Sequence, residues 1–156
     1  MSFVRHLLVD GSNILHAWPE LRSLAKRDRA AARAQLGQRL APIHDGEEVR
    51  VTMVFDGRGA ELAIERPSGL ATFSIVHTPA SLTADDVIEQ MVAAAAEPAS
   101  CCVATDDVAE RSMVSAAGGQ AITSEDLATW AKQAAARQRA AVEKLRAANR
   151  EEWRKP

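Results

Sequence analysis

Apolar residues along this chain follow two different periods. Short, nearly continuous apolar runs are typical of strands that are buried on both faces of a sheet. We expect such strands at residues 4–9, 49–55, 71–77, 100–104 and 120–122. The run at 71–77 alternates apolar and polar residues, which favours a place nearer the edge of the sheet.

Between these runs, apolar residues recur at helical spacing. We expect helices at residues 14–18, 20–40 and 87–96, a helix that ends at 117, and one from about 124 into the 150s. Pro42 and a turn at 44–46 end the second helix, and residues 57–69 form a loop. Because strands and helices alternate, the sequence predicts an α/β domain in which a mostly parallel sheet has helices on both faces.

The final helix carries a stripe of mostly small residues. Its members recur at steps of four and three: Leu127, Ala131, Ala134, Gln138, Ala141, Leu145 and Ala148. Such a stripe suits packing on the body of the domain, on a partner or on a second copy of the chain. A homodimer through this helix is therefore one of the options.

Three of the expected strands run directly into an aspartate. The segments read LLVDGSN at residues 7–13, VTMVFDG at 51–57 and CCVATDD at 101–107. In open α/β sheets, ligands bind outside the carboxyl ends of the strands. We therefore expect Asp10, Asp56 and Asp106 to lie side by side in one crevice.

Further acidic residues follow the same edge. Asp85 and Asp86 open a helix, and Thr83 and Asp86 have the spacing of a capping box. Glu110 lies one helical turn beyond Asp106 and is a candidate outer ligand. Each of these acids also has an ordinary interpretation, because aspartates cap helices and acids in a first helical turn are favoured by the helix dipole.

Carboxylates gathered in one crevice repel one another, and a divalent cation removes that repulsion. Hard oxygen ligands select Mg²⁺ or Mn²⁺, and two such ions can promote hydrolysis of a phosphodiester. The candidate catalytic residues are Asp10, Asp56, Asp85, Asp86 and Asp106, of which all but Asp56 are candidate metal ligands. The supporting candidates, which can orient an acid or cap a helix, are Ser12, Asn13, Thr105 and Glu110.

Composition is that of one ordinary domain of 156 residues, with 47% hydrophobic and 26% charged residues. No apolar run approaches the roughly 20 residues that span a bilayer, and the first residues lack the features of a signal peptide. The adjacent Cys101 and Cys102 point to opposite faces of a strand, so a disulfide between them is not expected. These features predict a cytoplasmic protein with reduced cysteines.

The net charge of −2 conceals an asymmetry. From residue 132 onward, eight basic residues stand against three acidic ones. We therefore divide the chain into a domain at 1–131 and a basic extension of its last helix at 132–156, within one structural unit. A basic segment on an acidic body indicates a polyanionic partner, although a solvated helix is the ordinary alternative. The candidate residues for contacts with such a polyanion are Arg58, Arg66, Lys132, Arg137, Arg139, Lys144, Arg146 and Arg150.

Four motifs together resemble a known family. LLVDGSN near the N-terminus, VFDG in the second strand, TADDVIE at a helix start and VATDD after the fourth strand are similar to the YacP-like branch of the NYN domains, which are relatives of the PIN-domain nucleases. The resemblance covers nearly the whole chain, including the AWPEL segment at 17–21 and the long charged C-terminal helix.

The resemblance implies a three-layer PIN-like, Rossmann-like fold and a metal-dependent endoribonuclease that cleaves mRNA in association with the ribosome. It implies metal-binding acids at Asp10, Asp85 and Asp106, with Asn13 beside the first. Asp56 and Asp86 match further acidic positions of the family. Ser12 stands where the family commonly has tyrosine, a change that bears on substrate stacking rather than on metal binding.

Other classes of function are alternatives to a nuclease. A catalytically inactive RNA- or ribosome-binding module of the same fold is the main alternative, although such a module has no need of every carboxylate. A phosphotransfer role for Asp10 is disfavoured, because Ser12 replaces the acid that a dehalogenase-type phosphatase needs there. No lysine follows the last strand at Ile122-Thr123, as a receiver domain requires, and Ile14 replaces the second serine of a metal-dependent adhesion site.

Overall fold

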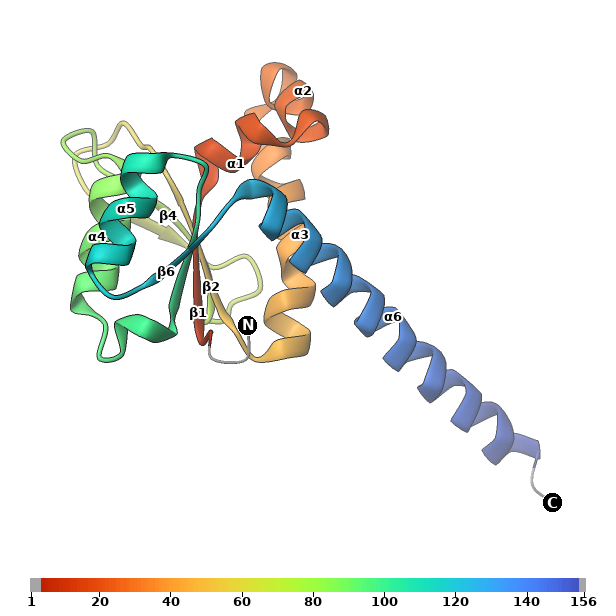
Figure 1. Ribbon diagram of the computed structural model, residues 1–156. Coiled ribbons are helices and arrows are strands. Elements are labelled where there is room, and N and C mark those ends of the chain that lie inside the picture. Colours follow the sequence, from red (N-terminus) through yellow and green to blue (C-terminus); the bar gives the residue numbers. More distant parts are fainter. Residues whose placement is uncertain (1–3, 155–156) are drawn as a thin grey trace.

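Residues 4–154 are described by the computed structural model, in which one sheet lies between two layers of helices (Figure 1). The strands are β1 (His6–Asp10), β2 (Arg50–Phe55), β3 (Ala63–Glu65), β4 (Phe73–His77), β5 (Cys101–Ala104) and β6 (Gln120–Ile122). The helices are α1 (Gly11–Ala17), α2 (Pro19–Arg27), α3 (Arg29–Glu47), α4 (Ala84–Ala94), α5 (Val108–Ala116) and α6 (Ser124–Arg154), with a short 3₁₀ helix η1 (Pro98–Ser100) before β5.

The sheet has the strand order β3-β4-β2-β1-β5-β6. β1 lies at its centre and pairs in parallel with β2 and β5, with Asp10 opposite Val54 and Val9 opposite Ala104. β4 and β6 extend the sheet in parallel on either side, and β3 alone is antiparallel and covers the edge of β4. The predicted α/β fold with a mostly parallel sheet is therefore confirmed.

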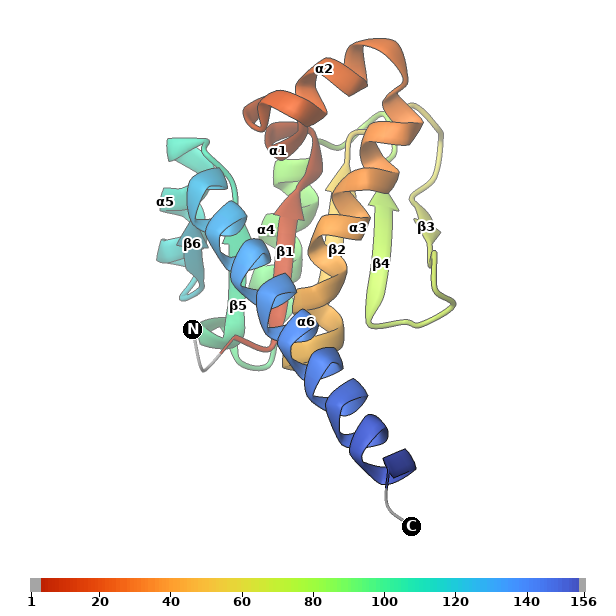
Figure 2. The ribbon, with the colours of Figure 1, turned by 90° about the vertical axis from the view of Figure 1, so that its right-hand side faces the viewer.

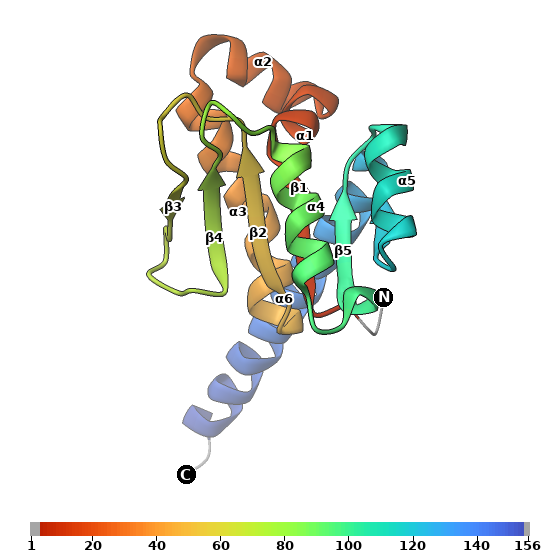
Figure 3. The same ribbon diagram turned by 90° about the vertical axis from the view of Figure 1, so that its left-hand side faces the viewer.

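Alternating residues of each strand reach the two helical layers. Leu7 and Val9 pack in the core beneath α1, α2, α3 and α6, whereas Leu8 packs in the core beneath α4 and α5. Figure 2 shows α3 and α6 across one face of the sheet, and Figure 3 shows α4 and α5 across the other. Cys102 and Cys101 divide between the same two cores, and both are free and buried, as predicted.

The prediction of a single helix at residues 20–40 is wrong in two respects. Asp28 interrupts it, because the Asp28 carboxylate accepts the backbone N–H of Ala31 at 3.0 Å and thereby starts α3. Pro42 and the turn at 44–46 do not end the second part, since α3 continues to Glu47. Leu40 and Ile43 are fully buried on the sheet, and this packing outweighs the local cost of a proline inside the helix.

The loop predicted at residues 57–69 contains a strand that the sequence does not reveal. β3 is three residues long and exposed throughout, so it has no hydrophobic pattern. Its antiparallel pairing places Ala63 opposite His77 and Glu65 opposite Ile75. The run at 71–77 is consequently the second strand from the edge.

α6 divides into a packed part and a projecting part. Leu127, Ala131 and Ala134 of the predicted stripe are buried, together with Trp130, whereas every residue from 136 to 154 is exposed. The projecting part leaves the body beyond the amino ends of the strands (Figure 2). Lys155, which belongs to the predicted basic extension, lies outside the described residues. Within residues 4–154, no helix is long and apolar enough to cross a membrane.

Candidate active site

Asp10 is the last residue of the central strand. Because residues of β1 alternate between faces, Asp10 lies on the same side as Leu8, which faces α4 and α5. Its side chain is only 6% exposed, and one carboxylate oxygen accepts the backbone N–H of Asn13 at 3.4 Å, so that Asp10 also caps α1. This contact fixes the carboxylate at the carboxyl edge of the sheet.

α4 is attached to the same edge through Asp56. The Asp56 carboxylate accepts the backbone N–H of Ala84 at 2.8 Å, which joins the end of β2 to the first turn of α4. Gly57 allows the backbone at Thr78 to approach closely, since a Cβ on Gly57 would lie 2.0 Å from the Thr78 carbonyl oxygen. Asp85, the next residue after Ala84, is thereby held at the rim of the site.

Glu110 comes from the first turn of α5. Asp107 caps this helix by accepting the backbone N–H of Glu110 at 3.1 Å, and the Thr105 hydroxyl accepts the backbone N–H of Asp107 at 3.2 Å. The Glu110 side chain is 4% exposed, and neither of its carboxylate oxygens has a hydrogen-bond donor among the described residues. A buried carboxylate without a donor is a strong sign of a missing proton or cation.

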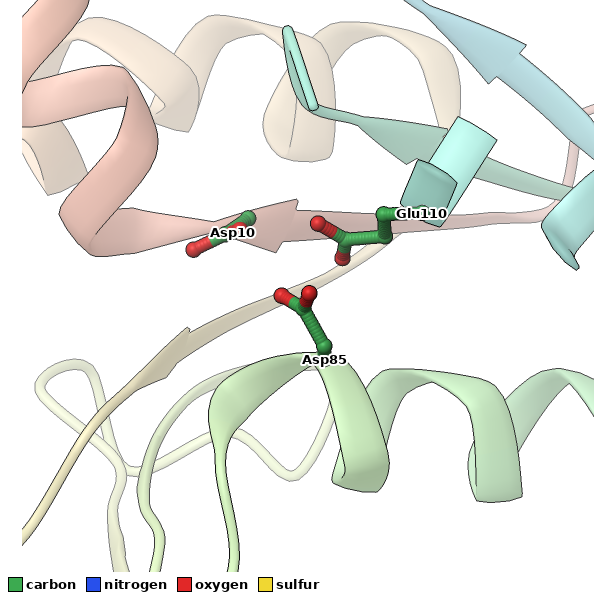
Figure 4. Close-up of side chains that lie close together, drawn as sticks. All are labelled: Asp10, Asp85 and Glu110. Atoms are coloured by element: carbon green, nitrogen blue, oxygen red, sulfur yellow. The ribbon is translucent and has the colours of Figure 1, made fainter. Parts of the chain in front are cut away.

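The three carboxylates of Asp10, Asp85 and Glu110 form one group, called here the acidic cluster. Each residue offers an oxygen within 4.8 Å of the oxygens offered by the other two. Figure 4 shows that they reach this place from β1, α4 and α5. Asp85 and Glu110 lie 75 or more residues after Asp10 in the sequence, so it is the fold that brings the three residues together.

Burial and mutual repulsion make the cluster hard to ionise. Burial, together with the neighbouring Asp10 and Asp85, raises the pKa of Glu110 to about 9. Burial is also the main cause that raises the pKa of Asp10 to about 6, against the opposing effects of Glu110 and of the Asn13 backbone N–H. The raised pKa keeps Glu110 protonated at neutral pH in the metal-free cluster.

This donor set fits a hard divalent cation. All of the converging groups are carboxylates, which are the ligands that Mg²⁺ and Mn²⁺ prefer. The unpartnered Glu110 oxygens gain a partner when a cation binds, and the repulsion among the three acids is removed. The acidic cluster can therefore hold a metal ion.

Two of the predicted metal ligands are engaged elsewhere. The Asp86 carboxylate accepts the backbone N–H of Thr83 at 3.0 Å in a complete capping box, and these bonds lower the pKa of Asp86. The Asp106 carboxylate accepts the backbone N–H of Ser124 at 2.8 Å and its hydroxyl at 2.6 Å. The structure does not bring Asp86 or Asp106 into the acidic cluster, and their role as metal ligands stays a prediction.

The predicted supporting residues lie around the cluster. The Asn13 side-chain oxygen accepts the backbone N–H of Asp106 at 2.9 Å, which links α1 to the turn before α5. The Ser12 hydroxyl is buried and has no hydrogen-bond partner in residues 4–154. Glu110, which the sequence suggests as an outer ligand, lies within the cluster itself. Leu8 and Asp10 are two residues apart in a strand, so their side chains lie on the same face of the sheet. This spacing is the signal in the sequence that places Asp10 on the face covered by α4 and α5.

The predicted RNA-binding residues are distributed over both ends of the sheet. Arg58 is exposed just after β2, at the same edge as the acidic cluster. Arg66 follows the antiparallel β3, which runs back toward the amino ends of the strands. Arg139, Lys144, Arg146 and Arg150 are exposed on the projecting part of α6, and Arg137 pairs with Glu47 at 2.8 Å. The projecting part of α6 therefore carries its cations away from the cluster (Figure 2).

One known family matches nearly the whole chain. A family model of the YacP-like NYN domain matches residues 7–156. The uncharacterized protein YacP of Bacillus subtilis (strain 168) is 33% identical over 106 residues, which are 67% of this chain. The match spans 62% of the length of that relative.

Solved structures give the same result. The crystal structure of the W164L mutant of Rae1 (YacP) from Bacillus subtilis superimposes with a TM-score of 0.76 at 27% identity, over 92% of this chain and 85% of the other. A second crystal structure of Rae1 (YacP) has a TM-score of 0.73 at 27% identity, over 92% and 82% of the two chains. NYN-domain membership suggests a nuclease-type, RNA-related function. The chain belongs to the family of YacP-like NYN domains.

Proposed function

We propose that this chain is a Mg²⁺- or Mn²⁺-dependent endoribonuclease that cleaves mRNA in association with the ribosome. The observation that carries the proposal is the convergence of Asp10, Asp85 and Glu110 at the carboxyl edge of the sheet, with the buried Glu110 oxygens lacking any donor in residues 4–154. Membership of the NYN family supports the nuclease class.

The acidic cluster would hold the cation, whereas Asp86 and Asp106, which the sequence predicts as further ligands, would hold α4 and α6 through their hydrogen bonds. Asp56 contributes by holding the first turn of α4, and Asn13 by joining α1 to the turn that carries Asp106. When bound, Mg²⁺ or Mn²⁺ supplies Lewis-acid activation of water and of the phosphodiester. The cluster offers carboxylates alone, so no serine, cysteine or histidine nucleophile is needed.

The projecting part of α6 would dock on ribosomal RNA. Its cations lie on an exposed helix that leaves the body, with Arg139, Lys144 and Arg150 free of ion pairs among the described residues. Contacts of lysine and arginine with phosphates position a protein on RNA without reading its bases. On this proposal residues 132–156 recruit a cytoplasmic nuclease of residues 1–131 to translating ribosomes.

The test is cleavage of labelled RNA in Mn²⁺, first free and then as mRNA on translating ribosomes. EDTA and the Asp10→Asn variant serve as controls. We expect cleavage that both controls abolish, and more of it in the ribosomal sample. If wild-type protein binds Mn²⁺ but cuts neither sample, the nuclease assignment is wrong and the chain is an inactive RNA- or ribosome-binding module of this fold.

A further inference from the structure

The α2–α3 segment carries five cations without acidic partners. We call this set the α2–α3 basic surface; it consists of Arg22, Lys26, Arg27, Arg29 and Arg33. All but the half-buried Arg33 are exposed, and none of the five makes an ion pair within residues 4–154.

Residues 19–40 also contain two acids. Glu20 pairs with Arg39 at 3.6 Å, and Asp28 accepts the backbone N–H of Ala31. Six basic residues against these two acids leave residues 19–40 with a net charge of +4. This excess of positive charge is available to a ligand from outside the chain.

The surface lies at the same edge of the sheet as the acidic cluster. β1, β2 and β4 point toward α1 and α2, which lie beyond the carboxyl ends of these strands (Figures 2 and 3). Trp18, which precedes α2, donates its indole N–H to the Ser124 carbonyl at 3.0 Å and ties α2 to the start of α6. The cations on the projecting part of α6 lie beyond the opposite edge.

Arg33 lies close to the backbone that carries Asp10, on the face of the sheet opposite to the Asp10 carboxylate. Its guanidinium carbon lies 5.8 Å from the centre of the Phe55 ring. The same ring packs on Gly11, where a Cβ would lie 2.3 Å from Phe55 Cε1, and Gly11 directly follows Asp10. One aromatic ring therefore separates a cation of the surface from the backbone of the cluster. Arg29 lies one helical turn before Arg33 and continues the surface outward.

We propose that the α2–α3 basic surface binds the phosphate backbone of a single RNA strand that flanks the scissile phosphodiester on one side. The proposal rests on the proposed nuclease function and extends it to residues that the motifs do not mark. An acidic cluster repels RNA, and adjacent cations supply the compensating attraction. Four of the five cations are arginines, whose planar guanidinium groups match phosphate oxygens in pairs.

We expect the α2–α3 basic surface to bind RNA strands of any base sequence. Residues 19–40 contain no aromatic side chain, and the ring of Phe55 is only 2% exposed. The surface therefore offers no platform on which bases stack, and its contacts are with phosphates. Binding through this surface consequently depends steeply on salt and little on the bases bound.

The test compares two triple variants of the full chain with the same change of charge. R22Q/K26Q/R29Q removes three exposed cations from the α2–α3 basic surface, and R139Q/K144Q/R150Q removes three from the projecting part of α6. Binding of a short fluorescent single-stranded RNA is measured by anisotropy in EDTA over a range of salt concentrations. Melting curves confirm that both variants fold, and the single variant Lys26→Gln serves if the first triple does not.

We expect the plot of log Kd against log salt to lose about 2 units of slope in the α2–α3 variant, or about 0.7 in Lys26→Gln, because each contact with a single strand contributes about 0.7. The α6 variant should lose less of the slope than the α2–α3 variant, because its cations lie beyond the edge of the sheet opposite the α2–α3 basic surface. Three results would overturn the proposal: an equal loss of slope in both triple variants, no loss of slope in the α2–α3 variant, or no RNA binding by the wild type. The α2–α3 basic surface would then suit an acidic protein instead.

Parallel cleavage assays in Mn²⁺ separate the two proposals. Loss of slope confined to the α2–α3 variant, with no cleavage by any preparation, would leave the RNA surface standing and remove the nuclease function. Cleavage of the RNA by the wild type, together with an unchanged slope in the α2–α3 variant, would support the nuclease function and overturn the proposed RNA surface.

Discussion

Two kinds of carboxylate lie at the carboxyl edge of the sheet, and they differ in what their oxygens accept. Asp86 and Asp106 accept hydrogen bonds from Thr83 and Ser124. Glu110 is more deeply buried than either of them, yet its oxygens accept nothing in the described residues. The carboxylates that accept hydrogen bonds hold helices in place, and the carboxylate without a hydrogen-bond donor is the one that a cation can bind.

Neighbouring residues in α4 give the sharpest form of this contrast. Asp85→Asn removes an acid of the cluster, whereas Asp86→Asn removes a capping acid from the next position in the chain. We expect Asp85→Asn to lower the rate of RNA cleavage by about 100-fold or more, at the upper end of the losses caused by removing supporting groups. Asp86→Asn should lower it by less than about tenfold. Equal losses in the two variants would place both acids on the metal.

The pH dependence of stability distinguishes the two kinds of carboxylate in the metal-free protein. The pKa of Glu110 is raised from 4.5 to about 9, so between these values the folded state binds a proton that the unfolded state has released. Stability from this group is complete below the lower value and is lost as the pH rises through the upper one.

The free energy of unfolding in EDTA, from urea denaturation at each pH, should therefore fall as the pH rises from 7 to 9. This range lies above the titration of His6, whose pKa is lowered from 6.5 to about 4 and which has the opposite effect on stability at lower pH. Glu110→Gln should flatten this dependence, because glutamine does not titrate. Mn²⁺ should oppose the fall in the wild type by binding the folded state. A wild-type profile that rises over this range would mean that Glu110 is ionised in the folded protein.

We expect the smallest effect on stability from a change to Thr83, which caps α4 with a hydroxyl rather than a carboxylate. Thr83→Ala removes the side-chain acceptor for the Asp86 backbone N–H, a loss of about 1 kcal/mol in the free energy of unfolding. For a chain of this size, Tm should fall by about 2–4 °C. Differential scanning calorimetry measures this shift, and Thr83→Ser, which keeps the hydroxyl, should retain the wild-type Tm.

Much of the fold follows from local pattern. Strands in the interior of the sheet are apolar on both faces, and the capping box at Thr83 forms as its spacing predicts. The errors arise where tertiary packing prevails over local signals. Pro42 lies inside α3 because its neighbours are buried on the sheet, and β3 forms only through pairing with β4.

The candidate site likewise combines features that local sequence predicts with features that depend on tertiary packing. Strand ends and a helix start identify Asp10, Asp56 and Asp85 as acids at one edge of the sheet. Spacing alone does not say which way the acids of the β5–α5 turn point, so Asp106 and Glu110 cannot be ranked from the sequence. The packed start of α6 settles their orientation, because Ser124 engages Asp106 and leaves Glu110 to face Asp10.

We propose that Glu110 belongs to the metal site and that the carboxylate of Asp106 holds α6. Calorimetric titration of Mn²⁺ into the wild type, Glu110→Gln and Asp106→Asn distinguishes the roles of the two acids. We expect a loss of Mn²⁺ affinity of about tenfold or more in Glu110→Gln, and near wild-type affinity in Asp106→Asn. Wild-type affinity in Glu110→Gln together with loss of binding in Asp106→Asn would reverse these roles.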